Sequence, residues 1–265
     1  TRSVVRIVSG RRMPGRRPHR LCGAKEIHMF IKLTPRLQTA LEMLRGLRAP
    51  VDIGCDHGYL TAALLADGGE RAAACDISAP SLEKARCLME RRGDASRVTF
   101  CLGSGFSCLP SGPWDGAALL GMGGELIARL LEERETLVHS MDRVVLQPMG
   151  GEKELRAWLY VRGWHIHKDV LAREDRRYYQ VICASWAGKP DSWPEEFPQE
   201  CFLLGYKTFA DGDPLLKPYC QKLLEQRQRR LAMARGTSGE EKLEKERQAL
   251  AQILCAMMRK GDCAL

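Results

Sequence analysis

The sequence has few aromatic residues, no long apolar run and no paired-cysteine motif. Phe, Trp and Tyr make up 6% of the 265 residues, and no apolar stretch approaches the roughly 20 residues that a membrane-spanning helix needs. The arginine-rich start lacks the apolar segment of a secretory signal. The eleven cysteines are odd in number and never spaced C-x-x-C, which argues against a disulfide framework and a zinc ribbon. These absences predict a cytoplasmic protein with reduced cysteines, no membrane contact and no metal.

Basic charge is concentrated at the N-terminus. The chain has a formal net charge of +8, and residues 1–20 contain seven arginines and no acid. The rest of the chain therefore carries only +1 (+8 minus 7), so a polyanionic partner has to be bound by local clusters of charge. Residues 1–28 are rich in Arg, Gly and Pro and have no periodicity, which predicts a disordered basic arm. The alternative is that the protein begins at Met29 and that residues 1–28 are translated upstream sequence.

Short apolar runs alternate with helical stretches from Leu33 onward, which predicts an open, mainly parallel α/β sheet. Thr34 is expected to cap a first helix that begins at Pro35. The expected strands are Pro50–Ile53, Arg71–Cys75, Arg97–Cys101, Asp115–Leu120, Arg143–Gln147, Trp164–Leu171 and Tyr178–Ser185. The expected helices between them are Tyr59–Ala66, Ser81–Arg92, Gly124–Glu133 and Glu152–Arg162.

Only six residues separate the last two expected strands, too few for a helical crossover, so these strands should form an antiparallel hairpin. A Rossmann-like sheet that ends in such a hairpin is typical of class I methyltransferases, and a dinucleotide-binding fold lacks it.

Two amphipathic helices are expected near the C-terminus. One has Leu216, Cys220, Leu223, Leu224 and Leu231 on one face, and the other has Leu243, Leu250, Leu254 and Met257. Ser238 and Glu241, between them, are spaced as a capping box. The expected organisation is therefore a basic arm at 1–28, a catalytic domain at 29–186, a connecting segment at 187–213 and a coiled-coil type helical hairpin at 214–265.

The segment VDIGCDHGYL, residues 51–60, is an apolar strand followed by a glycine-bearing turn and a helix. Such a turn brings a ligand onto backbone amides at the start of a helix. Asp52 favours a ligand with a cationic amino-acid end, because a carboxylate would repel a pyrophosphate. This pattern predicts S-adenosylmethionine as the cofactor.

Three further segments follow expected strands. Asp76 stands 24 residues after Asp52 and is expected to accept hydrogen bonds from both ribose hydroxyls. The alternative is that Asp76 or Ser78 caps the next helix. Gly103-Ser104-Gly105 is expected beside the cofactor adenine. Gly121-Met122-Gly123-Gly124 is expected to leave room for a substrate next to the methyl group.

Four segments in the same order resemble landmark segments of the tRNA (adenine-22-N1)-methyltransferase family, a bacterial group with a C-terminal helical domain. They are VDIGCDHGYL, GMGGELIARLL, RVVLQPMGGEKELRAWLYVRGW and ARE…YYQVI, and the likeness covers about Leu33–Glu225. The resemblance implies methyl transfer to N1 of an adenine in the D-loop region of tRNA, with tRNA as the partner. Two residues depart from the family pattern: Ser104 replaces an acid, and Met149 replaces a frequent asparagine.

We expect the cofactor to be bound by Asp52, Gly54, His57, Gly58, Tyr59, Asp76, Ile77, Gly103, Ser104, Gly105, Gly121 and Met122. Adenine N1 already has a lone pair in the plane of the ring, so the reaction needs alignment more than a strong base. Asp56 and Gln147 are the candidate catalytic residues, as acceptors for the amino hydrogens of the base. His57 is expected to orient the loop. The oligomeric state stays open, with a monomer among the options.

Two competing hypotheses remain. A glycine turn followed by a ribose-binding acid also serves NAD-dependent oxidoreductases, although the sequence lacks G-x-G-x-x-G. A catalytically silent RNA-binding protein on the same fold is the other.

Overall fold

A computed structural model describes residues 31–190, 193, 202–234, 236 and 239–262. The predicted basic arm at 1–28 and the predicted capping residue Ser238 lie outside these residues. Seven strands form one sheet: β1 Pro50–Ile53, β2 Ala72–Asp76, β3 Val98–Leu102, β4 Gly116–Met122, β5 Arg143–Pro148, β6 Trp164–Glu174 and β7 Arg177–Trp186. The helices are α1 Pro35–Leu44, α2 Tyr59–Ala66, α3 Ala79–Arg92, α4 Gly124–Glu133, α5 Glu135–His139, α6 Glu152–Val161, α7 Tyr206–Ala210, α8 Leu216–Ala234 and α9 Glu240–Asp262, with a 3₁₀ turn at Ala95–Arg97.

The strand order is β3-β2-β1-β4-β5-β7-β6. The first five strands are parallel, and β7 pairs antiparallel with both β5 and β6. The predicted terminal hairpin is therefore confirmed, and the sheet is the Rossmann-like one expected from the sequence. The chain reverses its direction of strand addition between β1 and β4, and ligands of such sheets bind outside the carboxyl ends of the strands at that point.

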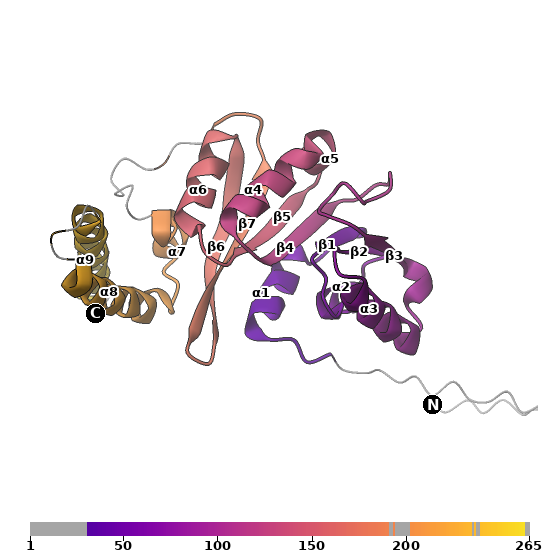
Figure 1. The fold of residues 1–265 in the computed structure, drawn as a ribbon, viewed down its shortest axis with the longest axis horizontal. Coiled ribbons are helices and arrows are strands. Elements are labelled where there is room, and N and C mark those ends of the chain that lie inside the picture. The colour runs from indigo at the N-terminus through magenta and orange to yellow at the C-terminus, as the bar shows by residue number, and fades with distance from the viewer. Residues whose placement is uncertain (1–30, 191–192, 194–201, 235, 237–238, 263–265) are drawn as a thin grey trace, which may run out of the picture.

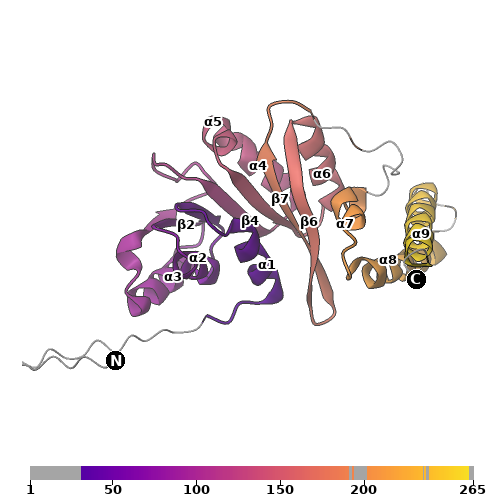
Figure 2. The ribbon, with the colours of Figure 1, turned by 180° about the vertical axis from the view of Figure 1, so that it is seen from behind.

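Helices cover both faces of the sheet (Figures 1 and 2). Alternate residues of β4 point to opposite sides. Ala117 and Leu119 pack with α4 and α6, while Ala118 packs with α1 and α2. A third cluster joins α2 and α3 to β2. Because both faces are covered, strands β1, β2 and β5 are buried almost throughout, and the carboxyl edge is where ligands gain access to this part of the sheet.

Local signals in the sequence set the start of several helices. Thr34 caps α1 as predicted, with its hydroxyl 3.5 Å from the amide of Leu37 and Pro35 in the first turn. The helix α3 begins two residues earlier than predicted, because Ser78 is its cap and accepts from the amide of Ser81. Short helices such as α5 and α7 have too few residues to show a period and were not expected.

The C-terminal helices α8 and α9 pack against each other beyond β6 (Figure 1). Leu216, Cys220 and Leu223 of α8 are buried in a cluster that contains Leu250 of α9 and Leu171 of β6. The cluster extends into the segment before α8, where Leu204 is fully buried. Leu204, Tyr206 and Phe209, which belong to the segment predicted as a connector, are thus packed in a cluster with Leu171 of the sheet. No helix among the described residues is both long and apolar enough to cross a bilayer.

Candidate functional site

The glycine turn between β1 and α2 is tied to the end of β2. The amides of Gly54 and Cys55 both donate to the carbonyl of Cys75, at 2.8 and 3.0 Å. Gly58 has φ +73°, and a Cβ there would come within 2.8 Å of the Cβ of Ala85 on α3. Glycine is required at this position both by the left-handed backbone and by the close approach of α3.

Asp52 lies behind this turn. Its carboxylate is buried and accepts hydrogen bonds from the amide and the hydroxyl of Thr61, at 3.1 and 2.7 Å. Burial raises the pKa of Asp52 to about 6, although the two bonds from Thr61 act in the opposite direction. The side chain therefore fixes the first turn of α2 below the carboxyl edge of the sheet.

Asp76 links the turn to the next helix. One carboxylate oxygen accepts from the amide of Asp56 at 3.0 Å, and the other accepts from the amide of Ser78 at 2.8 Å. Each oxygen keeps a further lone pair, which leaves Asp76 able to accept two more hydrogen bonds. Ser78 is the residue that caps α3, so the capping alternative for Asp76 is not needed.

Two large apolar side chains are exposed beside Asp76. Ile77 follows β2 and is 77% exposed, and Leu102 ends β3 and is 59% exposed. Asp76 and Leu102 are partners in the parallel register, so these side chains lie at neighbouring strand ends. Exposed apolar surface next to hydrogen-bond acceptors fits a ligand with a flat ring and a polar sugar. The sequence analysis named Ile77 and missed Leu102. Neighbouring residues of a strand point to opposite faces, so the position of Leu102 after the buried Cys101 was the available signal.

Asp56, His57 and Tyr59 form the outer rim of the turn. Asp56 has φ +48°, a conformation that Asp tolerates better than most residues. Its side chain is 69% exposed, with Oδ2 2.7 Å from Nδ1 of His57. The rings of His57 and Tyr59 stack with centroids 5.9 Å apart. This rim offers a carboxylate and two aromatic faces to an incoming molecule.

The segment after β3 lies against Asp76 as well. The amide of Gly103 donates to the carbonyl of Asp76 at 3.0 Å. Ser104 occupies the central position and its carbonyl accepts from the hydroxyl of Ser107 at 2.5 Å. Gly105 abuts Leu130 of α4. The predicted Gly103-Ser104-Gly105 segment therefore joins the same edge, and it presents no carboxylate there.

The segment after β4 meets the glycine turn directly. The Cε of Met122 lies 2.5 Å from the place where a Cβ of Gly54 would be. The carbonyl of Met122 accepts from the amide of Met149 at 2.7 Å, and the amide of Gly124 donates to the carbonyl of Gly150 at 2.9 Å. The ends of β1, β4 and β5 thus lie together at one edge of the sheet, with backbone hydrogen bonds joining the segments after β4 and β5.

Gln147, on β5, is fully buried. Its amide oxygen accepts from Nη1 of Arg36 at 2.9 Å, and its amide nitrogen donates to the carbonyl of Pro148 at 2.7 Å. Gln147 therefore lies near the carboxyl end of β5, but its side-chain oxygen, predicted to accept from the base, accepts from Arg36 instead.

Arg36 of α1 was missed by sequence reasoning. Its guanidinium lies 5.2 Å from the centre of the Tyr179 ring and 3.4 Å from the place where a Cβ of Gly121 would be. Glu174 accepts from the backbone amide of Arg36 at 3.1 Å and lies 3.9 Å from its Nε. That Nε is buried and has no hydrogen-bond acceptor among the described residues. Contacts spanning more than a hundred residues leave no local signal in the sequence.

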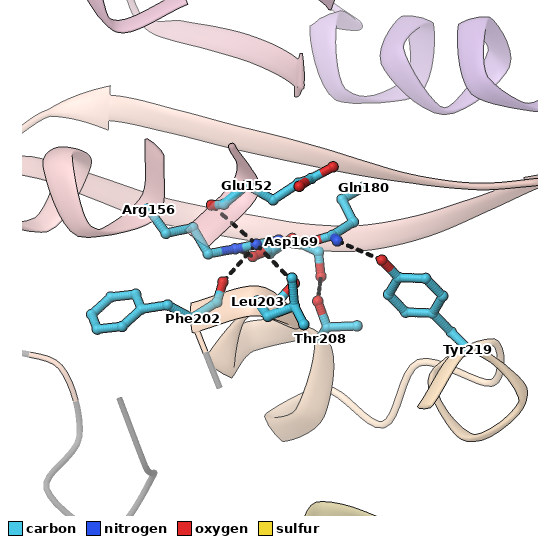
Figure 3. A network of polar contacts seen from close by, with 8 residues as sticks. All are labelled: Glu152, Arg156, Asp169, Gln180, Phe202, Leu203, Thr208 and Tyr219. Carbon is cyan, nitrogen blue, oxygen red and sulfur yellow. Dashed lines mark hydrogen bonds and ion pairs between the residues drawn. The ribbon is translucent and has the colours of Figure 1, made fainter. Parts of the chain in front are cut away.

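A second polar cluster lies at the other end of the sheet (Figure 3). Arg156 of α6 and Asp169 of β6 are buried and form a two-bond ion pair, with Nε–Oδ2 2.6 Å and Nη2–Oδ1 2.8 Å. Arg156 also donates to the carbonyl of Phe202 at 2.8 Å and to the side chain of Gln180. Gln180 donates to the hydroxyl of Tyr219 at 2.8 Å. The cluster fixes α8 relative to the sheet.

No group of three or more His, Cys, Asp or Glu side chains within the described part of the chain is arranged to hold a metal ion.

Comparison with known proteins gives matches at the levels of domain family, sequence and structure. Residues 33–182 match a family model described as a methyltransferase domain. The sequence is 32% identical over 163 residues to the tRNA (adenine(22)-N(1))-methyltransferase of Bacillus subtilis, covering 61% of this chain and 68% of that protein.

Solved structures agree in fold. The crystal structure of the B. subtilis m1A22 tRNA methyltransferase TrmK matches with a TM-score of 0.73 at 25% identity, covering 85% of this chain and all of that one. The TrmK of M. capricolum, solved with S-adenosyl-homocysteine, matches with a TM-score of 0.73 at 19% identity, over 85% of this chain and 99% of that one. At that identity the second match shows a shared fold alone.

Proposed function

This chain belongs to the tRNA (adenine(22)-N(1))-methyltransferase family, and from that premise we propose that it transfers a methyl group from S-adenosylmethionine to N1 of adenine 22 in tRNA. The observation that carries the proposal is the sequence match to the B. subtilis enzyme, which is 32% identical over 163 residues. The site geometry supports it, because acceptors suited to a ribose and apolar side chains suited to a purine lie together at the switch point of the sheet. We also propose that the protein works in the cytoplasm, where tRNA is the substrate.

The residues at the carboxyl edge fit S-adenosylmethionine. Asp76 has lone pairs left for two ribose hydroxyls, and Ile77 with Leu102 offers apolar surface for the adenine ring. We assign the remaining cofactor contacts to the glycine turn (Gly54, Gly58), its rim (His57, Tyr59), the Gly103-Ser104-Gly105 segment and Gly121-Met122. Asp52 contributes indirectly, because its hydrogen bonds to Thr61 hold the start of α2 in place. When bound, the cofactor supplies an electrophilic methyl group on a sulfonium.

The chain's own side chains position the acceptor base. The lone pair of adenine N1 needs no base to release it, so catalysis depends on alignment and on stabilising the positive charge that develops on the ring. We propose that Asp56 accepts a hydrogen bond from the exocyclic amino group of the base, since its carboxylate is exposed at the rim. Its negative charge also favours the cationic product. We propose that Gln147 acts through Arg36, as a positioning residue.

The test is methylation of a transcribed tRNA followed by nucleoside mass spectrometry. We expect 1-methyladenosine with the natural tRNA and none with a transcript in which adenine 22 is replaced by guanine. Asp56→Ala should lower kcat about a hundredfold, a larger effect than any it has on the affinity for S-adenosylhomocysteine. The matched control is Asp142→Ala, which removes an exposed aspartate next to the amino end of β5. Binding of tRNA without any 1-methyladenosine would instead identify a silent RNA-binding protein.

A further inference from the structure

A groove lies between the catalytic sheet and α8. Its volume is about 310 Å³. Its walls include Met149 and Gly150 after β5, Arg177 and Tyr178 at the start of β7, and Tyr219 and Lys222 of α8. The groove is thus built jointly by the sheet and by the C-terminal helices.

The groove adjoins the carboxyl edge of the sheet at the ends of β4 and β5. Met149, which is 51% exposed, forms part of its wall, and the amide of Met149 donates to the carbonyl of Met122. Tyr179 also lines the groove and packs under the guanidinium of Arg36. A molecule lying in the groove therefore reaches the backbone that borders the proposed methyl-transfer site.

The walls combine cations with aromatic rings. The ammonium of Lys222 lies 5.3 Å from the centre of the Tyr178 ring. The guanidinium of Arg173, which does not line the groove, lies 5.6 Å from the same centre. The Tyr219 ring is 5.2 Å from Tyr178, tilted by 34°. The acid in the groove, Glu152, already accepts from the amide of Gly150 at 3.1 Å. Aromatic faces beside positive charge are the features by which proteins hold unpaired nucleic acid strands.

Hydrogen bonds between α8, the segment before it and the sheet fix the geometry of the groove. The hydroxyl of Tyr219 accepts from Gln180, which belongs to the buried cluster around Arg156 (Figure 3). The amide of Leu171 donates to the carboxylate of Asp213 at 2.8 Å, just before α8. Lys222 also donates to the backbone carbonyl of Arg176. Because α8 is anchored at several points, the groove exists before any ligand binds, which lowers the entropic cost of binding.

We propose that this groove binds the stretch of tRNA strand next to the target adenine. In this proposal, which rests on the proposed function, a neighbouring base stacks on Tyr178, and Lys222 and Arg177 contact the adjacent phosphates. The chemistry of the reaction favours such a site. N1 lies on the pairing edge of adenine, so the target base has to be unpaired, and turning it out toward the cofactor removes it from its stack. Its neighbours then lose a stacking partner, which an aromatic side chain replaces.

The experiment measures the affinity of the full chain for transcribed tRNA over a series of salt concentrations, with S-adenosylhomocysteine present. Lys222→Ala should weaken binding and reduce the slope of log K against log salt by about one. Tyr178→Ala should weaken binding about tenfold through loss of stacking, whereas Tyr178→Phe should bind as the wild type does. The matched control is Lys84→Ala, which removes an exposed lysine from α3 at the other end of the sheet.

In steady-state methylation the same substitutions should raise KM for tRNA more than they lower kcat, and the affinity for S-adenosylhomocysteine should stay unchanged. The proposal is overturned if Lys222→Ala and Tyr178→Ala bind tRNA like the wild type, or if Lys84→Ala reduces the salt slope equally. If Tyr178→Ala lowers the melting temperature, the salt slope of Lys222→Gln decides in its place. A wild-type protein that binds tRNA but forms no 1-methyladenosine refutes the proposed function and leaves the groove to be judged by the binding data.

Discussion

The two polar regions of the molecule are built in different ways. At the carboxyl edge, the carboxylate of Asp76 receives backbone amides from Asp56 and Ser78 and keeps acceptor capacity for a ligand. At the far end of the sheet, Arg156 and Asp169 are buried and bound to each other and to neighbouring groups. The first arrangement is suited to binding a small molecule, and the second is suited to holding distant parts of the chain together.

Features that depend on neighbouring residues could be predicted from the sequence, and contacts between distant residues could not. The strands, the terminal hairpin and the glycine turn were predicted because each depends on neighbouring residues: apolar runs, a short connection, and glycines after a strand. Arg36, Gln147 and Glu174 meet across separations of 111 and 138 residues, and no local pattern records such a contact.

Arg156 had a weaker signal. It follows Leu155 and precedes Leu159, both buried, on the apolar side of α6. A charged residue on such a face suggests a buried partner. The sequence alone could not identify Asp169 as that partner, because the pairing depends on how β6 lies against α6.

The largest expected effect is on stability at the Arg156 cluster. Arg156→Met should lower the free energy of unfolding by about 3–5 kcal/mol, because it leaves the carboxylate of Asp169 buried without its cation. Arg162→Met, just past the end of the same helix, should lower the free energy of unfolding far less, since Arg162 pairs with Glu132 at the surface. Urea unfolding measures both.

The double variant Arg156→Met with Asp169→Leu gives a further control. It should recover part of the loss, because no unpaired charge then remains in the core. A single Arg156→Met variant as stable as the wild type would show that the cluster does not anchor the C-terminal helices.

A smaller effect is expected in the pH dependence of stability. The pKa of Asp52 is raised from 3.8 to about 6 in the folded state. Between these values the folded chain holds a proton that the unfolded chain has lost, so stability falls as pH rises through this window. About two pKa units correspond to roughly 3 kcal/mol.

Asp52→Asn removes this titration. The stability of the variant relative to the wild type should therefore increase from pH 4 to pH 7, whatever the constant cost of the substitution. Urea unfolding at several pH values measures the difference, and a difference that does not change with pH would contradict the burial argument.

The smallest expected difference is between two glycine variants, and it separates backbone strain from close packing. Gly58 and Gly93 have φ of +73° and +76°, but only Gly58 would place a Cβ against another residue, Ala85. Gly93→Ala should cost about 1–2 kcal/mol from the left-handed backbone alone. Gly58→Ala should cost about 1–3 kcal/mol more, from overlap with α3. Thermal unfolding without ligand compares the two variants, and equal losses would mean that α3 moves away freely.

The central claim is that the carboxyl edge around Asp76 binds the nucleoside of S-adenosylmethionine. Calorimetric titration with S-adenosylhomocysteine, with its 2′-deoxy analogue and with NAD tests it. We expect the wild type and Asp142→Ala to bind S-adenosylhomocysteine and to bind the analogue about tenfold more weakly, because a hydrogen bond to a charged group is lost. Asp76→Ala should bind both ligands weakly and without distinction. Tight binding of NAD with no response to S-adenosylhomocysteine, or unchanged discrimination in Asp76→Ala, would contradict the claim.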